Sequence, residues 1–512
     1  IHNSRRESVR AGLKRHPMRI TMKTGIDVSG RLLAHRVRIV ADTGPYATLG
    51  AEVLNFATEH VIGPYRYANI DVESVSVYTN NGMSGEFRGF GGSQAIFALE
   101  GQMDRLAELA GFDPWEFRLI NLRRMGDPGP FGQRIAQTDG AYQVWRKLKL
   151  KESALWRERA EIRSGGGPSA PAASVKPDEA GRPPWIRTGI GAAMVMHGFG
   201  LGFGIPDPAA GRLRLAEDGR IEAIFGYEEF GQGLLGAIEA LMIGTFGIGP
   251  DDLRIVVGDT DRVPDSGSST ASRTTAMIWQ ALRRMEQPFR RKLLEAAASL
   301  TGRAAGGLKL APGGVADAAS GLTLIRYADI AGRTGEPIEA EAHFHFPTTD
   351  MERIGAHFLY SYSAVAAKVE VNLLTGRVRV LDQYHAVAAG PVVNPMGYVG
   401  QIEGGSGMAL GFALLEDAVM ENGRYLTGNL DTYLIPTIAD AGGSVAVEPV
   451  EDLPEGDPYG PRGIGEIGSV GLAPAIAEAI HDATGVRVNR LPVDPALLIR
   501  RPEELWKAVG GP

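Results

Sequence analysis

The sequence predicts an α+β protein in which mixed sheets and helices share one chain. Hydrophobic residues make up 44% and charged residues 22% of the 512 residues, an ordinary globular composition with ample material for a core. β-type runs flank turns such as 27–30 and 218–219, which predicts hairpins. Elsewhere apolar residues recur at helical spacing, as in Ile476, Ala479 and Ile480. Strand-rich and helix-rich stretches that follow one another in this way favour an α+β arrangement.

The overall composition excludes several classes of protein. The net charge is -7 and no long basic run occurs, which argues against a nucleic-acid or acidic-membrane surface. No apolar run approaches the roughly 20 residues of a spanning helix, so we expect no membrane partner and a cytoplasmic location. The chain has no Cys, so disulfides and cysteine-ligated iron–sulfur clusters within it are excluded. Any iron–sulfur centre therefore has to lie on a partner.

The N-terminal third is expected to contain strands and then helices. Residues 1–80 are predicted as strands, including a hairpin over 21–40. A helix is expected after residue 93 and ends at Gly111. The next helix opens with Asp113 as the cap and Pro114 at the first helical position.

The segment 163–184 is low in bulky apolar residues and is predicted as a linker or surface loop. It divides the chain into 1–162 and 185–512. The glycine run 198–204 does not fit Gly-x-Gly-x-x-Gly opening a helix, so a dinucleotide site is not favoured there.

Residues 185–512 are expected to alternate hairpins with helices. Hairpins are predicted over 211–225 and 364–383. The elements expected to be helical are the segment 235–245, a long helix that Pro288 breaks or bends, and a small-residue helix through Leu414.

The stretch 462–485, RGIGEIGSVGLAPAIAEAIHDATG, places Glu466 on a glycine-rich loop before a helix. Glycine is used where the backbone takes unusual dihedrals or passes close to another group. A carboxylate in such a dry pocket is expected to have its pKa raised by desolvation. A structural alternative is a plain glycine-rich turn with a surface Glu.

This stretch resembles the C-terminal signature of the molybdenum hydroxylases, the xanthine dehydrogenase and aldehyde oxidase family, with Arg462 where the family usually has Lys. The resemblance extends over nearly the whole chain. It implies two molybdopterin-binding subdomains: the C-terminal part of the first in 1–162, and the second in 185–512. It also implies that Glu466 is the catalytic base.

Two further segments that resemble the family face the substrate. In the Arg-His-Pro segment, the resemblance implies a substrate contact for Arg15. In EFRGFGGS it implies that Arg88 and Gly89 lie beside the cofactor and that Phe90 stacks on the substrate ring. The structural alternatives are an ordinary surface Arg15 and a core Phe90.

The remaining loops of the resemblance are rich in Gly, Ser and Gln and imply contacts to the cofactor. Gln232, in a Gly-Gln-Gly motif, is implied to donate to an oxo ligand of the metal, and its structural alternative is a helix cap. No protein metal ligand is expected, because the metal arrives inside an organic cofactor. The candidate cofactor-binding residues in these loops are Gly231, Gln232, Gly233, Thr270, Ala271, Ser272, Gln401 and Gly465.

The resemblance implies hydroxylation of an aromatic N-heterocycle, purine-like, or of an aldehyde, with water as the oxygen source. The implied cofactor is molybdopterin, either as such or as its cytosine dinucleotide. The resemblance also implies partner subunits that carry 2Fe-2S clusters and FAD. The family's hammerhead domain and first glycine loop are not in these residues, so we expect a piece of a longer chain or a separate N-terminal half as a partner. The alternative is a non-catalytic scaffold or assembly subunit. A carbon monoxide dehydrogenase is disfavoured, because it needs a Cys near Phe90 for its copper.

Overall fold

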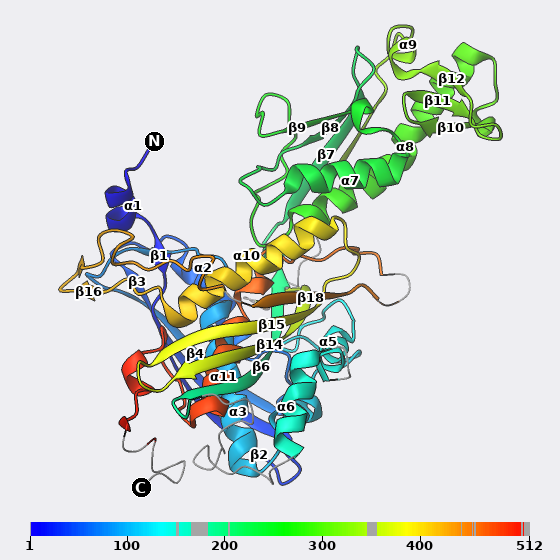
Figure 1. Ribbon diagram of the computed structural model, residues 1–512. Coiled ribbons are helices and arrows are strands. Elements are labelled where there is room, and N and C mark those ends of the chain that lie inside the picture. Colours follow the sequence, from blue (N-terminus) through cyan, green and yellow to red (C-terminus); the bar gives the residue numbers. More distant parts are fainter. Residues whose placement is uncertain are drawn as a thin grey trace.

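The computed structural model describes residues 2–149, 153–164, 183–202, 205–345, 356–441, 443–452, 454, 457–502 and 505, with the side chains of 160–164 left aside. A body built from both ends of the chain carries a lobe formed by its middle, residues 207–345 (Figure 1). Mixed sheets and helices make up both parts, which confirms the predicted α+β class. The predicted linker 163–184 lies almost entirely outside the described residues, so the predicted division there stays a prediction.

The body is organised around a sheet with strand order β18-β15-β14-β6. β14 is antiparallel to both of its neighbours, and β18 runs parallel to β15. Alternate residues of β14 face opposite sides, as the period of a strand requires: Val365 and Ala367 pack in a cluster with α11, while Ala364 and Ala366 pack in a cluster with α3 and α5. The elements concerned are β6 (Ile186–Phe199), β14 (Leu359–Asn372), β15 (Arg377–Ala388), β18 (Ser444–Val450), α3 (Gly92–Ala110), α5 (Gly140–Lys149) and α11 (Leu472–Thr484).

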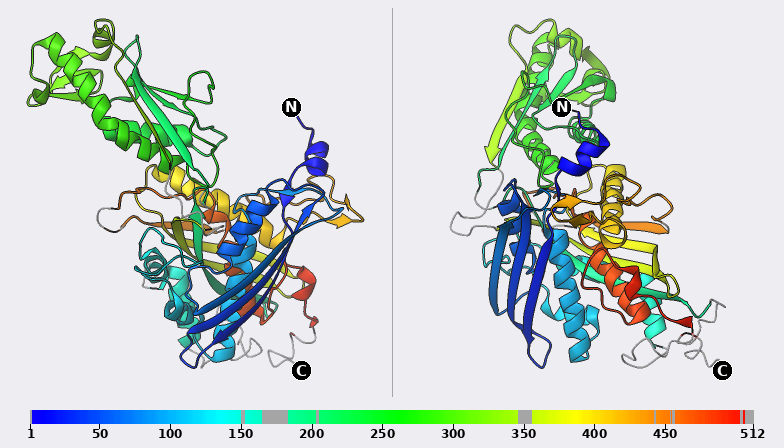
Figure 2. Two further views of the ribbon diagram at one scale, coloured as in Figure 1. Left: turned by 180° about the vertical axis from the view of Figure 1, so that it is seen from behind. Right: turned by 90° about the vertical axis from the view of Figure 1, so that its left-hand side faces the viewer.

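A second sheet of the body, with order β2-β3-β4, stands beside α2 and α3, and Figure 2 shows it from behind. The predicted hairpin is confirmed, since Met22 pairs with Val37 in an antiparallel register. The elements are β2 (Met18–Ile26), β3 (Leu32–Gly44), α2 (Gly50–His60), β4 (Asn69–Tyr78) and α4 (Pro114–Asn121). Asp113 caps α4 as predicted, because its Oδ1 accepts the N–H groups of Trp115 at 2.9 Å and Glu116 at 3.0 Å.

The lobe has its own core between a sheet of order β13-β7-β8-β9 and the helices α7 and α8. The hairpin predicted over 211–225 is confirmed as β7 and β8. The elements of the lobe are β7 (Pro208–Leu215), β8 (Ile221–Phe225), α7 (Leu234–Phe246), β9 (Leu253–Val257), α8 (Thr274–Thr301), β10 (Leu308–Ala311), β11 (Gly314–Asp317), β12 (Thr323–Arg326), α9 (Tyr327–Ala331) and β13 (Glu339–His345).

The helix α10 (Pro395–Leu414) runs along the body toward the lobe in Figure 1, and Asn394 caps it by accepting the N–H of Gly397 at 3.1 Å.

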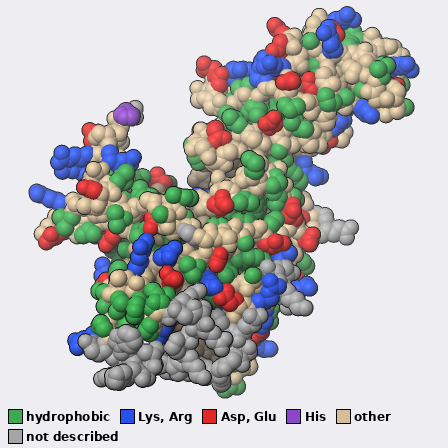
Figure 3. All heavy atoms as spheres, viewed as in Figure 1, with side chains coloured by type: hydrophobic (Ala, Val, Ile, Leu, Met, Phe, Trp, Pro, Cys, Tyr) green, Lys and Arg blue, Asp and Glu red, His purple; other side chains and the backbone are tan. Residues whose placement is uncertain are grey.

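Positive and negative side chains are interspersed over the face shown in Figure 3. Within the described residues, no helix combines the length and apolar character needed to cross a bilayer. The other elements are α1 (Arg5–Ala11), β1 (Lys14–Arg15), β5 (Ser84–Gly85), α6 (Ala154–Ser164), β16 (Met420–Glu421) and β17 (Arg424–Tyr425).

Two expectations about local structure are wrong. Residues 1–80 are not all strand: Ser4 and Glu7 form a capping box that begins α1, and α2 buries Val53, Phe56 and Ala57 at helical spacing. The predicted break at Pro288 does not occur, since α8 continues to Thr301, while the alternative of a bend there stays a prediction. Phe289 and Leu293 are buried beyond the proline, so packing of this face compensates for the lost backbone hydrogen bond.

A buried ion pair fixes the entry to the lobe. Arg273 and Asp207 are both fully buried and form an ion pair. The Arg273 guanidinium also donates from Nε to the Ser268 carbonyl at 2.9 Å, and Asp207 accepts the N–H of Leu201 at 2.8 Å. Burial raises the pKa of Asp207, and Arg273 opposes that rise. The pair therefore holds the loop before α8 against the chain segment that leads into β7.

We expect Arg273→Leu to lower the free energy of unfolding by about 3–5 kcal/mol, the usual cost of breaking a buried pair and leaving one charge alone. Arg291→Leu is the matched control, because Arg291 lies exposed on α8, the helix that Arg273 precedes. Urea unfolding of both variants measures the difference. Equal losses would show that the Arg273 pair is not a stabilising contact.

Candidate active site

The glycines around Glu466 allow backbone segments to approach one another closely. A Cβ on Gly463 would lie 2.2 Å from the carbonyl oxygen of Ser272, and one on Gly468 would lie 2.8 Å from the carbonyl oxygen of Ile402. A Cβ on Gly471 would meet the Val365 side chain at 2.6 Å. None of these distances is open to a real Cβ, so the glycines are needed for close approach.

The Glu466 carboxylate accepts contacts from segments far apart in the chain. Its Oε1 accepts the backbone N–H of Gly89 at 3.1 Å, and its Oε2 accepts the hydroxyl of Ser272 at 3.3 Å. The Nε2 of His197 lies 3.5 Å from the same Oε2. The side chain is only 16% exposed, so these contacts replace much of the lost hydration.

Desolvation acts on the pKa of Glu466 in the expected direction but does not decide the net value. Burial does raise the pKa, but His197, the Gly89 N–H and Ser272 together lower it further, and the net pKa lies below the usual value. The carboxylate is therefore ionised at neutral pH and protonates only under acid conditions.

Arg88 ties the Glu466 loop to α10. Its Nε donates to the carbonyl of Gly465 at 2.5 Å, and its Nη2 donates to the Gln401 side-chain oxygen at 3.0 Å and carbonyl at 2.9 Å. Gln401 in turn donates from Nε2 to the carbonyl of Gln232 at 3.2 Å. Gln401 lies inside α10, and these bonds join the loop before α3, the helix α10 and the turn before α7.

The polar side chains of the Gly-Gln-Gly turn bond to the backbone of the turn itself. The Gln232 carboxamide accepts the N–H of Phe230 at 2.7 Å and donates to the carbonyl of Glu228 at 2.7 Å. The carboxylate of Glu229 accepts the N–H groups of Gly231 at 2.7 Å and Gly233 at 3.3 Å. Burial raises the pKa of Glu229, and these backbone donors lower it more, for a net decrease. An anion bound at this turn would have to displace Glu229.

Three residues other than glycine around Glu466 have left-handed backbone conformations: Phe90 with φ 48°, Ala271 with φ 52° and Ser272 with φ 52°. Such values are uncommon, and for a bulky residue they indicate strain held by the surroundings. The Phe90 ring is half-buried and stands edge-on to Phe56 with centroids 5.9 Å apart.

Arg15 lies behind the Phe90 loop. Its Nη2 donates to the carbonyl of Arg88 at 3.0 Å, and its guanidinium lies 4.5 Å from the centroid of the Phe87 ring. Burial lowers the pKa of Arg15 to about 10, against charges that raise it. Its Nη1 is buried and has no hydrogen-bond partner within the described chain.

The structure thus joins eight of the thirteen predicted site residues by hydrogen bonds, and the other five lie in the same loops. Glu466, Gly465, Arg88, Gly89, Ser272, Gln401 and Gln232 form a connected set of hydrogen bonds, Arg15 joins it through Arg88, and Phe90, Thr270, Ala271, Gly231 and Gly233 belong to the same loops. Sequence reasoning missed His197 and Glu229. A single polar residue at the end of an apolar strand run is the signal that could have found His197.

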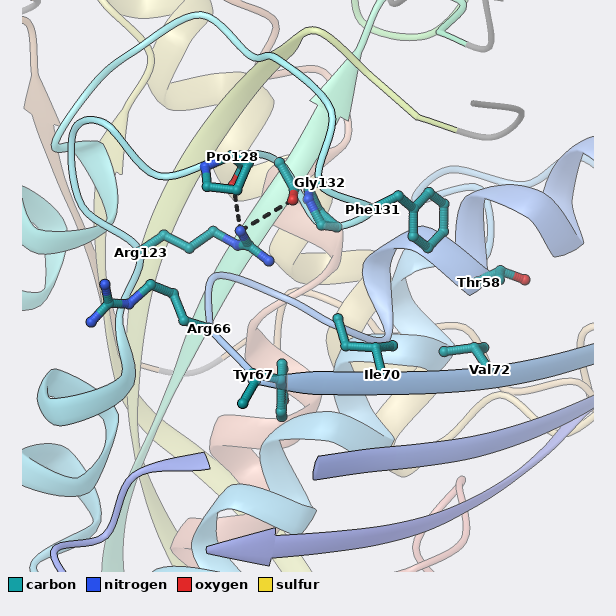
Figure 4. Close-up of a pocket in the computed structure, with 12 residues that line it drawn as sticks. Thr58, Arg66, Tyr67, Ile70, Val72, Arg123, Pro128, Phe131 and Gly132 are labelled. Carbon is teal, nitrogen blue, oxygen red and sulfur yellow. Dashed lines mark hydrogen bonds between the residues drawn. The ribbon is translucent and has the colours of Figure 1, made fainter. Parts of the chain in front are cut away.

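A cavity of about 780 Å³ lies elsewhere, between β4 and the loop 128–132 (Figure 4). Arg123 lines it and donates from Nη1 to the carbonyls of Pro128 and Gly129. No predicted site residue lines this cavity. It therefore belongs to a different region from the Glu466 site.

The donors of the Glu466 site suit a cofactor that brings its own metal. Among the described residues, no group of three or more His, Cys, Asp or Glu is placed to hold a bare ion. The site contains instead backbone N–H groups, amides and a hydroxyl, which bond to protein acceptors here, and the Nη1 of Arg15, which has no hydrogen-bond partner among the described residues. A Cβ on Gly465 would lie 3.0 Å from the Ser272 hydroxyl, a tight contact that glycine avoids.

Comparison with known proteins identifies the family of the chain. Two models described as a molybdopterin cofactor-binding domain match residues 1–122 and 169–442. The chain is 50% identical over 509 residues to a probable xanthine dehydrogenase subunit of Bacillus subtilis (strain 168), covering 99% of this chain and 64% of that protein. It is 28% identical over 508 residues to a xanthine dehydrogenase molybdenum-binding subunit of Escherichia coli O157:H7, covering 97% of this chain and 63% of that one.

The fold has a close counterpart among solved structures. The aldehyde oxidoreductase from Desulfovibrio desulfuricans superposes with a TM-score of 0.78 at 26% identity, covering 98% of this chain and 50% of that one. Fold and site therefore define a protein made of molybdopterin cofactor-binding domains. The chain belongs to the molybdenum hydroxylases, the family of xanthine dehydrogenase and aldehyde oxidase, which confirms the resemblance seen at 462–485.

We expect Gly463→Ala to destabilise the protein by about 1–3 kcal/mol, the range for forced overpacking, because the new methyl meets the Ser272 backbone. Gly407→Ala is the control: it lies in α10 with open space around it and should raise stability by about 0.5–1 kcal/mol. Urea unfolding of the two variants checks the prediction. A neutral Gly463→Ala would contradict the close contact.

Proposed function

We propose that this chain supplies the catalytic base and the substrate-facing loops of a molybdenum-dependent hydroxylase. The observation that carries the proposal is the Glu466 carboxylate, which is largely buried and accepts hydrogen bonds from Gly89 and Ser272, two of the predicted cofactor-binding residues. The reaction is hydroxylation of a purine-like aromatic N-heterocycle or an aldehyde, with water as the oxygen source. The names of the relatives, a xanthine dehydrogenase subunit and an aldehyde oxidoreductase, span these two substrate classes.

The proposed cofactor is molybdopterin, as such or as the cytosine dinucleotide. When bound, it supplies the metal and the two-electron redox chemistry of the reaction. The residues of this chain proposed to hold it are Arg88, Gly89, Gly231, Gln232, Gly233, Thr270, Ala271, Ser272, Gln401 and Gly465. Their amides, hydroxyl and backbone N–H groups are donors that fix a polar ring system without ligating a metal directly.

Glu466 is proposed to act as the general base. Its Oε1 is oriented by the Gly89 N–H and its Oε2 by Ser272, so the carboxylate has a fixed direction. Its lowered pKa keeps it ready to accept a proton at neutral pH, and activity is lost as pH falls through that pKa. Phe90 is proposed to stack on a flat substrate, and Arg15 to attract its polar atoms. The half-buried ring and the unpartnered Nη1 support these two assignments.

Electrons have to leave the chain after each turnover. The chain has no Cys and so cannot ligate an iron–sulfur cluster through thiolates. We therefore propose partners that carry 2Fe-2S clusters and FAD. The curated relatives extend beyond the region matched here, and their remaining third is proposed to be supplied as further chain or as a separate N-terminal half.

Glu466→Gln tests the proposed function. The amide keeps the size of the side chain but cannot accept the proton, and general-base catalysis contributes about 10²–10⁴-fold. We expect turnover per molybdenum atom to fall by about 10⁴-fold with cofactor content near wild type. Glu403→Gln, an exposed carboxylate on α10, is the control and should keep full turnover. A loss below about tenfold would remove Glu466 from the mechanism.

The partner proposal has its own test. The complex purified through this chain from its native host should contain iron and flavin in fixed ratio to molybdenum, because the electron path has to continue beyond the chain. Metal analysis and the flavin absorption spectrum measure these ratios. An active complex free of iron would refute the proposed partner.

A further inference from the structure

His197 is a buried polar side chain aimed at the proposed base. It lies in β6, its side chain is 2% exposed, and its Nε2 is 3.5 Å from Oε2 of Glu466. Within the described residues, neither ring nitrogen has a hydrogen-bond partner. A buried donor without a partner is costly, so its direction toward a carboxylate oxygen needs an explanation.

The surroundings hold the His197 ring in place. It packs against Phe56 with centroids 4.9 Å apart and against His60 with centroids 5.3 Å apart. A Cβ on Gly92 at the start of α3 would lie 3.3 Å from the ring. These contacts fix the position of Nε2 relative to the Glu466 loop.

The charged and titratable groups facing this pair come from several elements. His197 on β6, Arg88 before α3 and Arg15 on β1 face Glu466. Glu466 and His60 on α2 face His197, and His357 before β14 lies on the other side of His60, where Glu59 contacts both histidines. Glu59 accepts from the Nδ1 of His357 at 2.5 Å and lies 3.6 Å from the Nδ1 of His60.

The ring nitrogens of His60, the histidine beside His197, are both bonded to the backbone. The Nδ1–H of His60 donates to the carbonyl of Phe56 at 2.7 Å, and its Nε2 accepts the N–H of Gly198 at 2.8 Å. Both nitrogens of a neutral ring are thereby committed. Burial, followed by His197 and His357, holds the pKa of His60 well below its usual range. His60 therefore contacts His197 through its ring and does not compete with Glu466 for the His197 nitrogens.

We propose that His197 is a positioning residue for the reaction, donating from Nε2–H to Oε2 of Glu466 and holding that carboxylate ionised in its oriented conformation. This inference rests on the proposed function of Glu466. The 3.5 Å separation is long for a hydrogen bond, as catalytic contacts often are before the complete active complex forms. The lowered pKa of Glu466, to which His197 contributes most among the groups that lower it, agrees with this role.

A matched pair of amide variants tests the role. His197→Gln places an amide nitrogen near the position of Nε2, whereas the shorter side chain of His197→Asn cannot reach Oε2. We expect His197→Asn to move the acid limb of the pH profile of kcat/KM per molybdenum upward by about one pH unit. Burial raises the pKa of Glu466, and in this variant the contact with His197 no longer lowers it. His197→Gln should stay close to the wild-type profile. His385→Gln, a buried histidine on β15, controls for loss of a core imidazole and should leave the acid limb unmoved.

A second measurement needs neither turnover nor a His197 variant. Infrared difference spectra of wild-type complex and Glu466→Gln across pH isolate the Glu466 carboxylate. We expect it to titrate below the ordinary value of about 4.3. Titration at or above that value, or equal shifts of the acid limb in His197→Asn and His197→Gln, would overturn the role of His197. If Glu466→Gln itself keeps its turnover, the proposed function fails instead, so the two failures are distinguishable.

Discussion

The structure around the site depends on keeping one buried carboxylate charged. Removing a carboxylate from water is unfavourable unless donors replace the hydration it loses. Glu466 obtains them from Gly89 and Ser272, which lie 377 and 194 positions away in the sequence, and His197 lies beside one of the two carboxylate oxygens. The glycines of 462–471 are what allow these segments to come so close.

This constraint also joins the lobe to the body. Gln232 and Ser272 belong to turns that lead into α7 and α8 of the lobe, whereas Arg88 and Gln401 belong to the body. Arg88 and Gln401 connect the two parts through hydrogen bonds, and the buried Arg273 pair anchors the Ser272 loop from the side of the lobe. The position of the carboxylate is therefore set by packing across both parts, so a change in the lobe can reach the base without touching it.

Much of the fold could be predicted because its signals are local. Caps and apolar spacing predict α4 and α11, and turn residues predict the hairpins. α2 was missed because its apolar residues gain their meaning only when they pack on the β2-β3-β4 sheet, and α8 continues through Pro288 because packing outweighs a missing backbone donor. The site loops were predicted by motif. The lowering of the Glu466 pKa could not be predicted from the sequence. It depends on hydrogen-bond donors from distant segments, and their approach to Glu466 is known only from the fold.

The two sides of the site differ in how far they are already organised. Around the base, strained residues are held in place: Phe90 and Ser272 keep left-handed backbones, each at a cost of order 1–3 kcal/mol, which only over-determined surroundings sustain. The polar groups of the Gly-Gln-Gly turn already have hydrogen-bond partners within the turn: Gln232 accepts the N–H of Phe230, and Glu229 accepts the N–H of Gly231. For Gln232 to donate to a bound group, it has to exchange these contacts for others. A ligand shifts a conformation only by the difference in its interactions with the two states. The energetic coupling between cofactor binding and conformation is therefore expected at this turn rather than at Glu466.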